Sequence, residues 1–79
     1  SILNWIEIHI MKNYKYEINE TLYPAGCSEE YQKRNTFHVA YRKKQVVLLD
    51  DTPYSQNLYS ENGLSWFLET CLTQQTASI

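Results

Sequence analysis

The composition of this chain, 79 residues with 43% hydrophobic and 20% charged residues, excludes a disordered tail and predicts one small globular domain. Its net charge of -2 argues against a general binder of nucleic acid or of anionic membranes. The chain has no 18-residue apolar run and no signal-like opening segment. We therefore expect a cytoplasmic protein without a membrane span, with Cys27 and Cys71 as reduced thiols.

Charge and aromatic residues are distributed unevenly. Residues 1–44 hold all seven Lys and Arg with five acids, a net charge of +2, whereas residues 45–79 hold four acids and no base. Aromatic residues make up 14% of the chain and are mostly tyrosine. Tyrosine combines a large contact area with a polar tip, which suits interfaces. We expect a surface that is polarised in charge and rich in tyrosine.

The first two elements are predicted to be strands. Residues 2–10, ILNWIEIHI, and residues 14–23 both alternate apolar with polar side chains, the pattern of a half-buried strand. The short link at residues 11–13 suits an antiparallel hairpin.

A short helix is predicted over residues 28–35. Ser28 is a favourable N-cap, two glutamates occupy the first turn, and Lys33 and Arg34 occupy the last. Asn35 can end the helix in the left-handed conformation. Because the charges form i,i+4 pairs, they indicate local helix chemistry rather than a binding cluster.

The second half is predicted to contain a hairpin and a helix. Residues 36–42 and 45–50 would form the hairpin, with Lys43 and Lys44 at its tip and the Phe37, Val39 and Tyr41 side packed inward. A polar connection would follow over residues 51–61. Apolar residues at helical spacing then predict an amphipathic helix over residues 62–75, capped by Ser60 or Asn62. Its apolar positions are Leu64, Phe67, Leu68, Cys71 and Leu72.

Together these elements predict an α+β fold in one domain, residues 1–79. The expected architecture is a small antiparallel four-stranded sheet in ββαββα order, with the C-terminal amphipathic helix packed on one face. Residues 74–79 are expected to form a frayed tail.

Two features do not fit an isolated two-layer domain. Residues 46–49, VVLL, are apolar on both faces, which is typical of a strand buried on both sides. Trp66 falls opposite the apolar stripe of the predicted helix. A second copy or another protein covering these surfaces would explain both features, and so would folding of residues 51–61 back over Trp66.

We therefore expect a non-enzymatic binding or regulatory protein that acts through protein–protein contacts as a homodimer. The sequence predicts no metal and no cofactor, since its His and Cys residues lack ligand spacing and phosphate-binding loops are absent. The predicted interface anchors are Trp66, Tyr59, Tyr54 and Trp5.

The alternative hypothesis is a single-stranded nucleic-acid binder or a metal-independent ribonuclease. Basic and aromatic side chains gathered at a hairpin tip are typical of single-strand binders. His38 and Arg42 would share one strand face, and Glu7 or His9 could join them if the strand order allowed it. The residues predicted for this site are His38, Arg42, Lys43 and Lys44.

Overall fold

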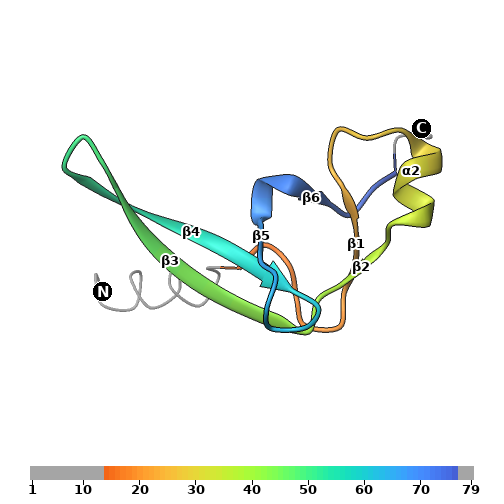
Figure 1. Cartoon of the computed structure of the whole chain (residues 1–79), viewed down its shortest axis with the longest axis horizontal. Coiled ribbons are helices and arrows are strands. Elements are labelled where there is room, and N and C mark those ends of the chain that lie inside the picture. The colour runs from red at the N-terminus through yellow and green to blue at the C-terminus, as the bar shows by residue number, and fades with distance from the viewer. Residues whose placement is uncertain (1–13, 77–79) are drawn as a thin grey trace, which may run out of the picture.

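The computed structural model describes residues 14–76 and shows a mostly β fold made of two antiparallel sheets. In chain order the elements are β1 (Thr21–Pro24), α2 (Glu29–Arg34), β2 (Phe37–His38), β3 (Tyr41–Leu49), β4 (Thr52–Ser60), β5 (Phe67–Leu68), the 3₁₀ turn η1 (Glu69–Cys71) and β6 (Leu72–Thr73). The strand order is β2-β1-β6 in one sheet, which we call the smaller sheet, and β3-β4-β5 in the other. The long β3–β4 hairpin extends to one side of a body formed by the remaining elements (Figure 1).

The hydrophobic core lies where the base of the hairpin meets the smaller sheet. The Tyr16 and Tyr59 rings pack edge to face, with 5.3 Å between ring centroids, and the Tyr14 ring packs against Tyr59 at 6.2 Å. One core therefore joins the two sheets at the base of the hairpin. Its buried members are Tyr16, Leu22, Phe37, Val39, Tyr59 and Leu72.

Helix α2 confirms the sequence prediction in its start and its charge pairs. The Ser28 hydroxyl accepts a hydrogen bond from the Tyr31 amide at 3.2 Å. Both i,i+4 ion pairs form, at 2.6 Å and 2.9 Å. The left-handed ending predicted at Asn35 is wrong, because its φ is -126° and its side-chain amide instead donates to the Tyr31 carbonyl.

The strand predicted over residues 36–42 is divided between the two sheets. The Val39 amide donates to the Glu20 carbonyl, whereas the next amide, of Ala40, donates to the Ser60 carbonyl. Phe37 and Val39 are buried as predicted, but Tyr41 is half exposed. The predicted inward face therefore ends where the backbone changes its hydrogen-bonding partner.

The turn of the second hairpin lies farther along the chain than predicted. Lys43 and Lys44 are inside β3, and the turn is formed by Asp50 and Asp51. Both aspartates have positive φ, 50° and 63°, as a two-residue type I′ turn requires. Aspartate tolerates this conformation better than most residues. Residues 51–61, predicted to be a polar connection, instead contain strand β4.

The predicted α+β class, with a four-stranded sheet and a C-terminal helix, is wrong. Within residues 14–76, the only α-helix is α2, and both sheets have three strands. The region predicted to be helical starts with a tight turn, in which Gly63 has a φ of +77° and donates its amide to the Ser60 hydroxyl. Leu72 is then used in β6, opposite Pro24 of β1.

The first half of the chain also differs from the prediction. Of the strand expected over residues 14–23, only residues 21–23 belong to a strand, β1, which ends at Pro24, and the residues before it form bends and turns. The strand expected over residues 2–10 lies outside the described residues.

Candidate interaction surface

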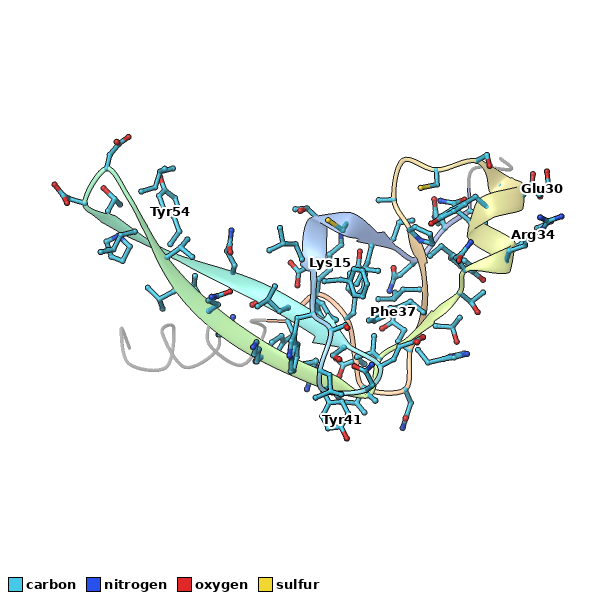
Figure 2. The ribbon with its side chains drawn as sticks, viewed as in Figure 1. Lys15, Glu30, Arg34, Phe37, Tyr41 and Tyr54 are labelled. Carbon is cyan, nitrogen blue, oxygen red and sulfur yellow. The ribbon has the colours of Figure 1, made fainter. Side chains whose placement is uncertain are left out.

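The distal part of the β3–β4 hairpin, residues 45–56, is an apolar arm that stands away from the body (Figure 1). We call this segment the arm. Val46, Leu48 and Leu49 are 67%, 73% and 60% exposed. Tyr54 on the opposite strand is 51% exposed, and Figure 2 shows its side chain on the arm, far from α2. The arm thus presents large apolar side chains to solvent.

Both faces of the arm are apolar. Residues opposite each other in an antiparallel pair share a face. One face carries Leu48 opposite Pro53, and the other carries Val47 opposite Tyr54. The strand predicted to be buried on both faces is therefore largely uncovered by the described part of the chain. The two-sided apolar pattern of residues 46–49 is evident in the sequence, whereas their exposure is evident only in the structure.

A hydrogen-bonded cluster around one carboxylate holds the base of the arm. Glu69 Oε2 accepts from the Tyr59 hydroxyl at 2.5 Å, from the Asn57 amide at 2.8 Å and from the Lys15 backbone at 3.1 Å. The Tyr59 hydroxyl also accepts from the Tyr16 backbone amide at 3.1 Å. These bonds tie β4 to η1 and to the segment before β1.

The same hydrogen-bonded cluster shifts the pKa values of two of its members, Glu69 and Tyr59. Burial acts to raise the pKa of Glu69, but the hydrogen bonds from Tyr59, Asn57 and Lys15 outweigh it and hold that pKa below its ordinary value. Burial, reinforced by the hydrogen bond to Glu69, raises the pKa of the Tyr59 phenol. At neutral pH the acceptor is therefore ionised and the donor neutral, which favours a strong hydrogen bond.

The four predicted interface anchors have different environments. Tyr54 lies on the arm. Tyr59 is 0% exposed and belongs to the core, so it does not contribute to the exposed surface. Trp66 is half buried before β5, with Lys43 Nζ 4.3 Å from its ring centroid. Trp5 lies outside the described residues.

The residues predicted for nucleic-acid binding are not gathered on one face. His38 is in the smaller sheet, where its Nδ1 lies 3.0 Å from the Thr21 hydroxyl. Arg42 and Lys44 share one face of β3, whereas Lys43 between them occupies the other. Glu7 and His9 lie outside the described residues.

The basic side chains of β3 also have contacts within the chain. The Arg42 guanidinium donates to the Tyr16 carbonyl at 2.9 Å and stacks on Tyr14. Lys44 Nζ donates to the Asn57 side-chain oxygen at 2.5 Å. The Asn57 bond lies within the hairpin, but Lys44 Nζ is also 4.8 Å from the Tyr14 ring centroid. Arg42 and Lys44 therefore both contact the segment before β1.

Neither the cavities nor the grouping of possible metal ligands among residues 14–76 provides a stronger candidate site than the arm. A pocket of about 250 Å³ between α2, β2 and β5 is lined partly by Phe37, Phe67 and Leu72, and it is smaller than most ligand sites. Among residues 14–76, no three His, Cys, Asp or Glu side chains are grouped as a metal site. In the same range, none of the helices has the length and apolar character needed to cross a membrane.

Comparisons of the chain with models of protein families, with curated proteins and with solved structures found no match. A functional proposal therefore depends on the geometry of the arm.

Proposed function

We propose that this chain is a small non-enzymatic protein-binding module whose contact surface is the arm, and that it associates as a homodimer. The observation that carries the proposal is the exposure of Val46, Leu48 and Leu49, each 60% or more, on a segment that no layer of the described chain covers. Contiguous exposed apolar side chains on a small domain mark contact surfaces.

The energetics of burial support this proposal. Fully burying one aliphatic side chain contributes about 1.5–3 kcal/mol. The loss of translational and rotational freedom on association costs about 4–15 kcal/mol. Burial of three or four side chains on each of two arms would contribute free energy of the same order as this cost. Tyr54 adds aromatic contact area with a polar hydroxyl, a residue type enriched at interfaces.

The nucleic-acid alternative has less support. Arg42 and Lys44 contact Tyr16 and Asn57 within the chain, and Lys43 points to the opposite face. A cytoplasmic location remains part of the proposal; both Cys27 and Cys71 are free thiols.

Photo-crosslinking tests the binding surface. Two tyrosines provide a matched pair: Tyr54 on the arm is 51% exposed, and Tyr31 on α2 is 52% exposed. Each is replaced in turn by benzoylphenylalanine, and the chain is irradiated both purified and in a cell extract. We expect position 54 to give a protein adduct that excess unmodified chain suppresses, and position 31 to give none. No suppressible adduct at position 54, or equal adducts at both positions, would overturn the proposed function.

A further inference from the structure

The outer edge of β3 provides a second observation about the arm. In the sheet order β3-β4-β5, β3 is an end strand, and no described strand pairs with its other side. Half of its backbone amides and carbonyls therefore point away from β4. Natural sheets protect such edges with charges, proline or short length. β3 has nine residues, and its charged side chains are confined to the half nearest the body.

The order of charges along this edge is self-complementary. Lys43 and Lys44 precede the apolar residues 46–49, and Asp50 and Asp51 follow them in the turn. When a strand of this pattern meets a second copy in antiparallel orientation, the basic end of each lies beside the acidic end of the other. A parallel arrangement would instead place like charges together, which is unfavourable.

We infer that the occupant of the β3 edge is a second copy of this chain, paired antiparallel about a two-fold axis at Val47. This inference rests on the proposed function. In this register Val46 lies opposite Leu48 of the second copy, and Lys44 lies opposite Asp50. The two sheets join into one six-stranded sheet of order β5-β4-β3-β3-β4-β5. Two-fold pairing of the same strand is a closed, isologous contact, so it ends at a dimer.

The register makes the apolar faces of the two arms continuous. Opposite residues in an antiparallel pair share a face, and Val46 and Leu48 already share one within each copy. Pairing them across the axis therefore extends each apolar face over both copies. Backbone hydrogen bonds along the edge contribute affinity, and the alternating side chains set the register.

Cysteine crosslinking tests the inference, in a background where Cys27 and Cys71 are both replaced by serine. Val47→Cys would place a thiol opposite its own copy, at a spacing compatible with a disulfide. The control is Leu49→Cys, because Leu49 is more exposed than Val47 but would lie opposite Gln45. Random collision therefore favours position 49, whereas the proposed register favours position 47.

With oxidised glutathione as oxidant, we expect Val47→Cys to form a covalent dimer at least ten-fold faster than Leu49→Cys. Equal rates, a faster Leu49→Cys, or no dimer from Val47→Cys would overturn the register. Sedimentation of the unmodified chain tests the second copy itself, and a strict monomer at high micromolar concentration would overturn it. The photo-crosslinking result at position 54 distinguishes failure of this inference from failure of the proposed function. An adduct with a different protein would support the binding function and overturn the homodimer, whereas the absence of any adduct would overturn both.

Discussion

The two ends of the β3–β4 hairpin share one ladder but have opposite surroundings. At the base, Tyr59 is fully buried and its hydroxyl donates a hydrogen bond to Glu69. At the distal end, Leu48 opposite Pro53 faces solvent. Nine continuous pairs connect the two ends, from Tyr41–Ser60 to Leu49–Thr52. Backbone pairing therefore continues beyond the point where the body stops covering the side chains, so the base is held by tertiary contacts and the arm by its own strand pairing.

Truncating the base should have the largest effect. Tyr59→Ala removes a fully buried ring and the hydrogen bonds of its hydroxyl, so we expect a loss of about 3–5 kcal/mol in the free energy of unfolding. Such a loss would unfold much of so small a domain. Urea denaturation followed by circular dichroism measures the change. The control, Tyr54→Ala on the arm, should change stability by less than about 0.5 kcal/mol at concentrations below dimerisation. Similar losses for both variants would contradict the contrast between base and arm.

Glu69→Gln should have the next largest effect. The substitution keeps the shape of the side chain but removes the charge that accepts from Tyr59, Asn57 and the Lys15 backbone. Hydrogen bonds to charged groups contribute about 1.5–3 kcal/mol, so we expect a loss in that range. The matched control is Glu30→Gln, which breaks the exposed α2 ion pair with Arg34, seen at the surface in Figure 2. Its expected cost is below about 0.5 kcal/mol. An equal cost for both variants would show that the hydrogen bonds of Glu69 stabilise the fold no more than an exposed ion pair does.

The same carboxylate makes folding sensitive to acid. The pKa of Glu69 is lower in the folded chain than in the unfolded chain, where it is about 4.3. Its contribution is therefore complete above that value and declines as pH falls through the folded pKa. Denaturation midpoints measured from pH 7 to pH 3 should fall, and Glu69→Gln should make this decline shallower. Parallel pH profiles for the two proteins would exclude Glu69 as a source of the dependence.

A single change on the arm should separate association from folding. Leu48→Ser removes a side chain that is 73% exposed, so the monomer should lose less than about 0.5 kcal/mol of stability. Leu48 would meet Val46 across the proposed axis, so the substitution should weaken association. Sedimentation should show a several-fold higher dissociation constant, so that the dimer dissociates at a higher protein concentration than the dimer of the unmodified chain. An unchanged dimer would remove Leu48 from the contact.

The smallest effect is expected at the tip. Asp50→Asn combined with Asp51→Asn keeps residues that tolerate positive φ but removes the acidic end of the proposed pairing. Exposed ion pairs contribute at most about 1 kcal/mol and are screened by salt. We expect weaker dimerisation at low ionic strength and little difference at 1 M salt, measured by sedimentation. A difference that persists at high salt would indicate that the turn itself, rather than its charge, had changed.

Part of this structure follows from neighbouring residues alone. Helix α2 forms as predicted because its cap and ion pairs join residues three or four positions apart. The inward direction of Phe37 and Val39 also follows from local alternation. Of the predicted anchors, Tyr54 lies on the arm, and the two-sided apolar run at residues 46–49 is evident from the sequence alone.

The remaining features depend on partners distant in sequence. The helical spacing from Leu64 to Leu72 predicts a helix, yet Leu72 pairs with Pro24 and Leu68 pairs with Leu58 in sheets. Likewise, the strand expected over residues 36–42 is divided because the Val39 amide bonds to a segment earlier in the sequence and the Ala40 amide to a segment later in it. An apolar pattern states which side chains favour burial, but the tertiary structure decides whether a second layer reaches them. Here that layer covers the base of the hairpin and leaves the side chains of the arm exposed.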